Sequence, residues 1–326
     1  ICAGFINTSR LGLVTGEAKF DEIGDLEGFA LSDEGEINIA GRDMLYSDGE
    51  KIFLGLDSRS VSYTDLVSHV IKITADIYAG QELNIATGND FYDYKNKKIT
   101  AKENEELPEE AFAVDAVHLG AIRAGKINII ATQAGFGVKA LSNLVSDLDD
   151  ISINANGEVV VHQVNSHKDI DITSSAKLHN EEAIIAAGDL TIKAESVVNN
   201  ENSLISGNNI NLNLTDFEHY GQLLAISNLG LEIDDLTNNS VVQADGDLTI
   251  KANNLVNNDL FYAGNNLHVD LVNSLLNKPS SLLYAYNDMS IIAAGDVMNN
   301  QANIIAENGS LDFALQGNLT NNSAFI

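Results

Sequence analysis

Apolar and polar residues alternate in short segments through the second half of the chain. Leu190, Ile192 and Ala194 are separated by polar residues, and the same spacing returns at residues 248–252. Alternation with a period of two is typical of a β-strand that buries one face. The segments are bounded by Gly and Asn, which are favoured in tight turns. The pattern therefore predicts an all-β chain of short strands.

The alternating segments recur about every 20 residues, and a two-residue slot, most often Asn-Asn, marks each repeat. The slots begin at Asn180, Asn199, His219, Asn238, Asn257, Asn277, Asn299 and Asn321. A fixed period of this size indicates stacked supersecondary units. The Leu-x-x-Leu-x-Leu frame and helical return of a leucine-rich repeat do not occur. Because crossovers between parallel strands are right-handed, we predict a right-handed parallel β-helix of roughly 14 to 16 coils.

The repeat also predicts which side chains lie inside the β-helix. Ile192, Leu212, Ile250 and Val269 follow a turn marker at similar distances, so we expect them in interior stacks. The slot asparagines are expected to hydrogen-bond from coil to coil and to tolerate left-handed backbone. We assign this turn and ladder role to Asn199, Asn238, Asn257, Asn299 and Asn321. His219 occupies one slot, where a turn role is favoured over a ligand role.

Residues 1–140 carry the strand pattern less regularly. Segments 35–39, 80–85 and 124–129 copy the later repeats, so the β-helix is expected to begin near residue 1. Residues 91–110 predict a hairpin or loop off the coil axis, and residues 58–72 a short helix or packed loop. Residue 1 already lies inside a running strand pattern, so we expect a fragment of a longer protein.

The charge composition disfavours two classes of binding partner, nucleic acids and anionic membranes. The 326 residues include 47 acidic and 18 basic ones, a net charge of −29. This surface repels phosphate backbones and anionic membranes, so neither nucleic-acid binding nor membrane insertion is expected. Two prolines in the whole chain suit a structure in which nearly every backbone N–H joins a ladder. The single cysteine, Cys2, can form neither an intrachain disulfide nor a structural zinc site.

No set of residues predicts catalysis, a metal or a cofactor. A glycosidase needs two carboxylates facing each other across a groove, whereas adjacent strand residues point to opposite faces. The seven histidines show no metal-ligand spacing. The groups that we weighed as catalytic, and assign to solvated turns or isolated surface positions, are Asp147, Asp149, Asp150, Asp234, Asp235, Arg59 and Arg123.

Four ordered blocks resemble the secretion domain of two-partner-secretion exoproteins. This family includes filamentous haemagglutinin, contact-dependent growth-inhibition exoproteins and activated haemolysins. The blocks are residues 4–16, 29–39, 77–88 and 114–138. The repeats from about residue 150 resemble haemagglutinin repeats. The resemblance identifies a secretion motif in the first block, formed by Phe5, Ile6, Asn7, Thr8, Ser9 and Arg10.

The resemblance implies that residues 1–140 are the C-terminal part of the secretion domain, also called the haemagglutination activity domain. Residues 141–326 are then haemagglutinin-type repeats. It further implies a non-catalytic shaft, exported by an outer-membrane transporter barrel and secreted or exposed at the bacterial cell surface. The parent would be an adhesin or a growth-inhibition toxin carrier that binds a receptor on a host or neighbouring cell. A pore-forming haemolysin and a polysaccharide-degrading β-helix are the alternatives.

Overall fold

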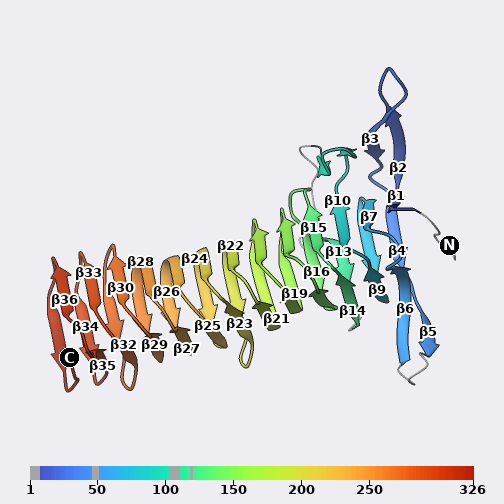
Figure 1. The fold of residues 1–326 in the computed structure, drawn as a ribbon. Coiled ribbons are helices and arrows are strands. Elements are labelled where there is room, and N and C mark those ends of the chain that lie inside the picture. Colours follow the sequence, from blue (N-terminus) through green and yellow to red (C-terminus); the bar gives the residue numbers. More distant parts are fainter. Residues whose placement is uncertain (1–7, 46–50, 101, 103–110, 118–119) are drawn as a thin grey trace. The chain divides into compact units, whose positions relative to one another are not determined.

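The computed structural model describes residues 8–45, 51–100, 102, 111–117 and 120–326, and no helix occurs among them. The chain divides into two compact units, Ile1–Ala176 (unit 1) and Lys177–Ile326 (unit 2), and each is a parallel β-solenoid (Figure 1). The predicted all-β solenoid is confirmed. Together the described parts make about 13 turns, fewer than the 14 to 16 expected. The difference arises because insertions lengthen several turns of unit 1.

The described residues of unit 1 form twenty strands. They are β1 (Arg10–Val14), β2 (Gly16–Phe20), β3 (Leu26–Leu31), β4 (Glu36–Ile39), β5 (Arg42–Leu45), β6 (Lys51–Ser58), β7 (Tyr63–Ser68), β8 (Val70–Ile73), β9 (Asp76–Ala79), β10 (Glu82–Thr87), β11 (Phe91–Asp93), β12 (Lys98–Ile99), β13 (Ala111–Ala116), β14 (Ala121–Ala124), β15 (Ile127–Ala131), β16 (Phe136–Ala140), β17 (Asn143–Ser146), β18 (Ile151–Ala155), β19 (Val159–Ser166) and β20 (Ile170–Ser174).

Three parallel ladders wrap around the core of unit 1. The first joins β1, β7, β10, β15, β18 and β20. The second joins β4, β8, β13, β16 and the first half of β19. The third joins β6, β9, β14, β17 and the second half of β19. The strands expected at residues 35–39, 80–85 and 124–129 are confirmed as β4, β10 and β15.

A separate antiparallel sheet of four strands, in the order β12-β11-β3-β2, lies outside the ladders of unit 1. β11 and β12 form a hairpin, which confirms the insertion expected after residue 91. Residues 103–110 of that insertion lie outside the described part. The helix or loop expected at residues 58–72 is wrong, because this segment forms β7 and β8. All residues of β7 after Tyr63 are buried, so the alternation that identifies a half-buried strand is missing there.

Unit 2 contains seventeen strands. They are β21 (Lys177–Ala186), β22 (Leu190–Asn199), β23 (Leu204–Gly207), β24 (Ile210–His219), β25 (Gln222–Ala225), β26 (Leu229–Asn238), β27 (Val241–Ala244), β28 (Leu248–Asn257), β29 (Leu260–Ala263), β30 (Leu267–Leu271), β31 (Leu275–Asn277), β32 (Leu282–Ala285), β33 (Met289–Ala293), β34 (Val297–Asn300), β35 (Asn303–Ala306), β36 (Leu311–Leu315) and β37 (Leu319–Asn322).

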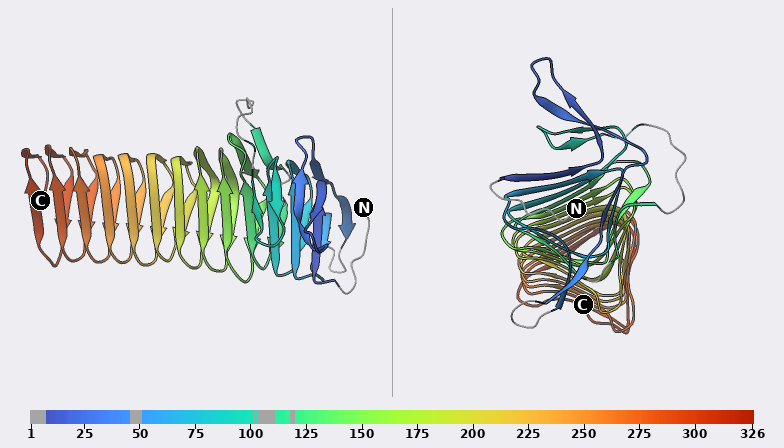
Figure 2. Two further views of the ribbon diagram at one scale, coloured as in Figure 1. Left: turned by 90° about the horizontal axis from the view of Figure 1, so that it is seen from above. Right: turned by 90° about the vertical axis from the view of Figure 1, so that its right-hand side faces the viewer.

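Each coil of unit 2 passes through three parallel sheets. Face A contains the first halves of β22, β24, β26 and β28, followed by β30, β33 and β36. Face B contains the first half of β21, the second halves of β22, β24, β26 and β28, and then β31, β34 and β37. Face C contains the second half of β21, then β23, β25, β27, β29, β32 and β35. Figure 2 shows the successive coils side by side.

The corner between faces A and B is visible in the burial pattern. In β24 inward and outward residues alternate except at Thr215 and Asp216, which are both exposed. Two consecutive outward residues reverse the phase of the alternation. The ten-residue strand therefore turns the corner while apolar side chains point inward on both sides of it.

Aliphatic side chains fill the interior of unit 2. Ile192, Leu212, Ile250 and Val269 are at most 2% exposed, and Ile250 is the Cα partner of Val269 in the next coil. The predicted interior positions are confirmed. Only Phe217 and Phe261 add large aromatic rings to this core.

We expect the assignment of interior and exterior positions to decide the effect of mutations at β28. Ile250→Ala should lower the free energy of unfolding by about 2–5 kcal/mol, because it removes buried methyl groups and leaves a cavity. Thr249→Ala should cost less than about 1 kcal/mol. Urea unfolding followed by circular dichroism measures both changes.

Ile250→Asp should also open the solenoid locally. Coil stability in a solenoid is close to a sum over nearest neighbours. Limited proteolysis should therefore cut near residue 250 while the preceding coils stay protected, and Thr249→Asp serves as the matched control. Equal tolerance of Asp at the two positions would contradict the assignment.

Candidate functional site

The secretion motif expected from the resemblance leads into β1. Phe5, Ile6 and Asn7 lie outside the described residues. The Thr8 hydroxyl donates a hydrogen bond to the Arg10 carbonyl oxygen at 2.8 Å. The Ser9 carbonyl oxygen accepts the backbone N–H groups of Ser62 and Tyr63, each at 3.1 Å. This part of the motif is therefore held to the segment that begins β7, and Arg10 directs its side chain into a buried cluster.

The centre of the cluster is the carboxylate of Asp65, whose side chain is 1% exposed. The Arg10 Nε group donates to one carboxylate oxygen, and the Asn84 side-chain amide donates to the other at 2.8 Å. A carboxylate this deeply buried is tolerated because both oxygens are paired. Burial works to lower the pKa of Arg10, but its hydrogen bond with Asp65 and the charge of Asp65 outweigh burial and raise that pKa.

The four-stranded sheet covers this cluster with aromatic side chains. The guanidinium carbon of Arg10 lies 4.1 Å from the centroid of the Tyr94 ring. Tyr92, on β11, is 1% exposed and belongs to a small second core with Leu31, Val67, Ala86 and Ile99. Burial, followed by the charge of Asp65, raises the pKa of Tyr92 to about 12. Its phenol thus stays neutral at physiological pH.

The polar row extends from coil to coil on the outer surface of β7, β10 and β15. Asp65 is the Cα partner of Asn84, and Asn84 is the partner of Asn128. The Asn128 amide donates to the Asn84 carbonyl oxygen at 2.8 Å. In the row beside it, Lys97 of the β11–β12 turn donates to Glu82 at 2.6 Å. The Arg10–Tyr94 and Lys97–Glu82 contacts therefore tie the β11–β12 hairpin to the solenoid at two points.

No sequence motif points to a role for Asp65, Asn84 or Tyr92. A signal was present, because Asp65 and Asn84 are separated by 19 residues, which is one coil. Aligning residues 60–90 on the later period would have placed both in one column. The irregular segments on either side obscured that alignment.

The slot asparagines of unit 2 form a column at the ends of the face B strands, which is buried except at Asn321 in the last coil. Five side-chain amides donate to the side-chain carbonyl oxygen of the asparagine in the next coil, at 2.8–3.0 Å. The pairs are Asn180 to Asn199, Asn238 to Asn257, Asn257 to Asn277, Asn277 to Asn299, and Asn299 to Asn321. The same amide groups also donate to backbone carbonyls that begin face C, such as Leu260 and Leu282.

The left-handed backbone that these asparagines were expected to tolerate is not used by them. None of the five assigned residues has a positive φ, and the positive-φ positions of unit 2 are Asn202, Ser280, Gln301 and Ser323. The column asparagines lie in extended strands because their side chains must point inward to reach the next coil. The sharp turn follows two or three residues later.

His219 occupies one place in the column and changes its bonding. Its Nδ1 lies 3.3 Å from the Asn199 amide nitrogen, and its Nε2 lies 3.1 Å from the Val241 carbonyl oxygen. The neutral ring that carries its proton on Nε2 satisfies both contacts. No donor then remains for Asn238, so the column divides into two ladders. Burial lowers the pKa of His219 to about 4, against the opposing effect of the Val241 hydrogen bond.

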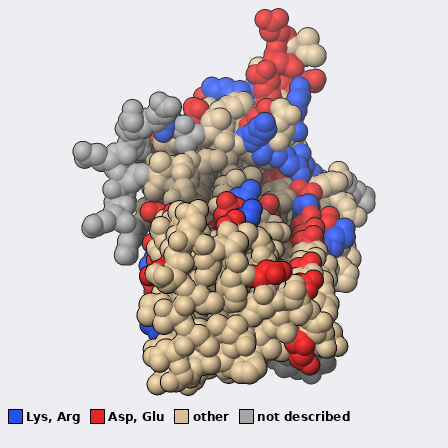
Figure 3. All heavy atoms as spheres, turned by 90° about the vertical axis from the view of Figure 1, so that its left-hand side faces the viewer, with Lys and Arg blue, Asp and Glu red and all other residues tan. Residues whose placement is uncertain are grey.

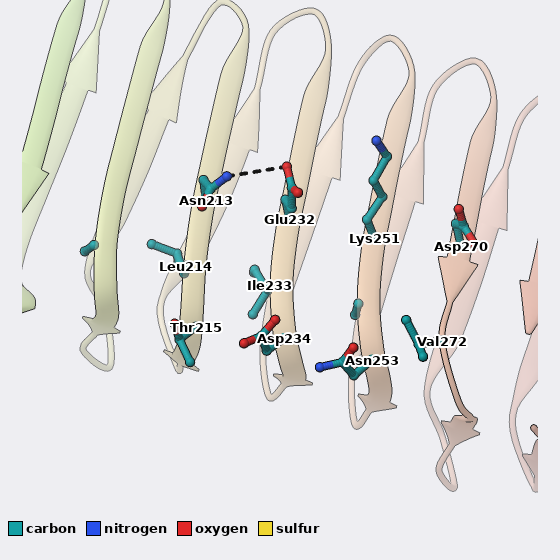
Figure 4. A pocket seen from close by; sticks show the side chains of 12 residues that line it. Asn213, Leu214, Thr215, Glu232, Ile233, Asp234, Lys251, Asn253, Asp270 and Val272 are labelled. Atoms are coloured by element: carbon teal, nitrogen blue, oxygen red, sulfur yellow. Dashed lines mark hydrogen bonds between the residues drawn. The ribbon is translucent and has the colours of Figure 1, made fainter.

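Face A carries a shallow polar hollow of about 350 Å³ at its corner with face B (Figure 4). Asn213, Glu232, Lys251 and Asp270 point outward from neighbouring strands, and Asn213 donates to Glu232 at 3.4 Å. A second hollow, of about 540 Å³, surrounds Gly230, which lacks a side chain between Asn211 and Thr249. Both hollows follow from the stacking of short and long side chains in one outward row.

The carboxylates weighed as catalytic groups lie on the surface, in turns and ion pairs or, for Asp234 and Asp235, at the corner within β26. Asp147 accepts two hydrogen bonds from Arg123, each at 2.6 Å. Asp149 accepts one from Lys168 at 2.9 Å, and Asp235 accepts one from Asn254 at 2.7 Å. Within the described part of the chain, no cluster of His, Cys, Asp or Glu could hold a metal ion. No helix long and apolar enough to span a membrane occurs there either.

Comparisons with known proteins divide the chain in the same order as the sequence resemblance. Residues 3–161 match the family model of the TPS secretion domain. Residues 152–213, 227–278 and 264–323 match the haemagglutinin repeat. No solved structure matches the chain.

Three similar relatives are much longer than this chain. Toxin CdiA of Yersinia pestis is 33% identical over 186 residues, which are 57% of this chain and 5% of the relative. A tRNA nuclease CdiA of Yersinia mollaretii is 28% identical over 208 residues, 64% of this chain and 6% of the relative. A 16S rRNA endonuclease CdiA of Enterobacter cloacae is 24% identical over 213 residues, which are 65% of this chain and 6% of the relative. The chain thus spans about one-twentieth of these relatives.

The Asp65 cluster predicts a large loss of stability when the ion pair is broken. Asp65→Ala should cost about 2–4 kcal/mol, because it leaves the Arg10 guanidinium and the Asn84 amide without their acceptor. Asp147→Ala, which breaks an exposed pair, should cost less than about 1 kcal/mol. Urea unfolding at neutral pH measures the loss of unfolding free energy in each variant. Similar losses would show that the buried ion pair contributes no more to stability than the exposed one.

His219 predicts an acid-dependent loss of stability. The unfolded chain takes up a proton on this histidine near pH 6.5, whereas the folded chain does so only near pH 4. Stability must therefore fall as the pH drops from 6.5 towards 4. His219→Asn removes this group, so the loss between pH 7 and pH 4.5 should be about 2 kcal/mol smaller in the variant. Carboxylates titrate equally in both proteins, and identical pH profiles would contradict the assignment.

Proposed function

Because the chain belongs to the two-partner-secretion exoproteins, we propose that it joins the end of a secretion domain to the first repeats of a shaft. Exoproteins of this family are secreted and surface-exposed, and their secretion domain implies an outer-membrane transporter as partner. The observation that carries the proposal is the order of the two family matches, with the secretion domain at 3–161 and the repeats reaching 323.

We propose a separate role for each of the two parts of the chain. Residues 1–140 contribute the secretion domain, in which the segment from Phe5 to Arg10 acts as the secretion motif. Residues 141–326 contribute shaft repeats that separate the secretion domain from later parts of the parent. The contact of Arg10 with the Tyr94 ring supports this reading, since Tyr94 packs against the small second core and so couples the motif to the four-stranded sheet.

The parent is proposed to carry a contact-dependent growth-inhibition toxin to a receptor on a neighbouring cell. The similarity to relatives named as CdiA toxins and nucleases supports this choice over a host adhesin. The segment itself is proposed to be non-catalytic and to bind no nucleic acid. The ion pairing of its candidate carboxylates and its net charge of −29 support that part.

Export through a narrow barrel requires an unfolded chain without covalent cross-links. A single cysteine satisfies this requirement, because it excludes an intrachain disulfide. Folding can then proceed coil by coil outside the barrel, since each coil is stabilised mainly by its neighbours.

A disulfide between neighbouring coils should block export. Thr249 and His268 are Cα partners in adjacent parallel strands, where the spacing of about 4.8 Å suits a disulfide. The parent carrying Thr249→Cys, His268→Cys and Cys2→Ser should accumulate in the cell under oxidising conditions. Immunoblotting of the medium and cell surface should then show less exoprotein, and a reductant should restore it.

The matched control carries Thr249→Cys and Cys2→Ser without the second cysteine, and it should be exported like the wild type. Deletion of the transporter should abolish export of every variant. Equal export of the cross-linked variant and the control would refute unfolded threading. Export without the transporter would refute the proposed secretion function itself.

A further inference from the structure

The four-stranded sheet of unit 1 is built by two hairpins that come from different coils. β1 begins the first coil, β7 the second and β10 the third, since these strands follow one another in a parallel ladder. The hairpin of β2 and β3 leaves the first coil directly after β1 (Figure 1). The hairpin of β11 and β12 leaves the third coil directly after β10. The second coil, which lies between them, contributes no strand to the sheet.

An antiparallel pairing between β3 and β11 joins the two hairpins. At its centre Phe29 of the first coil is the Cα partner of Tyr92 of the third coil. Beside it the backbone N–H of Leu31 donates to the Asp90 carbonyl oxygen at 2.7 Å. The sheet therefore connects the first coil to the third coil across the second.

Side chains beneath the sheet come from all three coils. Val14, Val67 and Ala86 are Cα partners in β1, β7 and β10, and they point away from the interior of the solenoid. Val67 and Ala86 are nevertheless at most 3% exposed, because they pack in one small core with Leu31 of β3 and Ile99 of β12. This second core stays buried only while the three coils remain stacked under both hairpins.

Neither hairpin is expected to be stable by itself. An isolated two-stranded hairpin is marginal in water, and independent stability requires more strands or packing against another element. β11 and β12 are only three and two residues long, so their pairing alone supplies few hydrogen bonds. The two hairpins therefore depend on each other and on the second core.

The C-terminal coils of unit 2 lack such a connection. Every residue of unit 2 is described, and its strands belong to the solenoid ladders alone. Figure 3 looks onto this end of unit 2, where uncharged side chains predominate. Coils that contact only their neighbours should open one after another from the end, so the free energy of opening rises coil by coil towards the middle.

We propose that the four-stranded sheet is a clasp, which makes the first three coils open and close as one unit. The first coil cannot separate from the second without breaking the β3–β11 pairing and exposing the second core, and both of these also hold the third coil. The clasp thus keeps the guanidinium of Arg10 against the Tyr94 ring until the three coils open together. It arises from contacts within the folded chain and does not depend on the proposed secretion function.

Hydrogen–deuterium exchange of the 326-residue chain, followed by mass spectrometry at increasing urea concentrations, tests the clasp. Peptides that cover β1, β7 and β10 should report the same free energy of opening and the same dependence on urea. Peptides that cover β36, β33 and β30 are the internal reference, and their free energies of opening should rise in that order. Free energies that rise from β1 through β7 to β10 overturn the proposal.

A substitution in the third coil shows whether the first coil depends on it. Ile99→Ala removes methyl groups of β12 from the second core, so exchange of β1 should become about tenfold faster or more. Ile153→Ala is the matched control, because this 1% exposed residue lies in β18, which pairs with β15 and β20 outside the clasp. The control should leave exchange of β1 within about twofold of the wild type. Unchanged exchange of β1 in Ile99→Ala, or equal effects of the two variants, overturns the proposal.

A substitution at Gly28 tests the joint between the hairpins directly. A Cβ atom there would overlap the Tyr92 carbonyl oxygen, so Gly28→Ala forces β3 and β11 apart. Gly12→Ala is the matched control in the first coil, since its Cβ would meet only the Val14 Cγ2 atom, at 3.9 Å.

With the joint broken, β1 should open more readily than β7, and β7 more readily than β10, as in an ordinary solenoid. Gly12→Ala should keep the uniform opening of the wild type. Circular dichroism checks that both variants retain the β spectrum of the wild type. Uniform opening in Gly28→Ala would show that the sheet does not couple the coils, and it would refute the clasp.

Discussion

Each unit depends on keeping successive coils in register. Parallel backbone ladders place every residue above its counterpart in the previous coil, so Leu231, Ile250 and Val269 form one interior column. A shift of one residue would turn this column outward and bury the row that contains Thr249. Three features keep the coils in this register: the alternation along each strand, the paired outward residues at the corners and the buried asparagines.

Much of the fold could be predicted because the register of the coils appears in the sequence as a repeat of about 20 residues. The steps near 20 residues in the Asn slot located the coils, and the alternation located interior residues such as Ile250. The prediction failed where both faces of a strand are buried. β7 is covered by the core on one side and by the four-stranded sheet on the other, so Thr64 and Asp65 are as buried as Leu66.

The buried polar groups divide into those that follow the period and those that do not. The Asn column repeats with the coils, so its positions could be read from sequence, although its strand backbone could not. The Arg10–Asp65 pair joins residues 55 positions apart. No local pattern specifies such a pair, because it depends on how β1, β7 and β11 are brought together. Of the buried cluster around Asp65, only Arg10 could therefore be named in advance.

The asparagine column has a direction. Each amide donates to the coil that follows it in sequence, so the carbonyl oxygen of a newly placed asparagine satisfies the donor left by the coil before. The direction ends with the last coil, where Asn321 is exposed and its amide donates to the Ala324 carbonyl oxygen instead. At His219 the neutral ring offers no such hydrogen to Asn238, so the run of amide donors is interrupted there and begins again at Asn238.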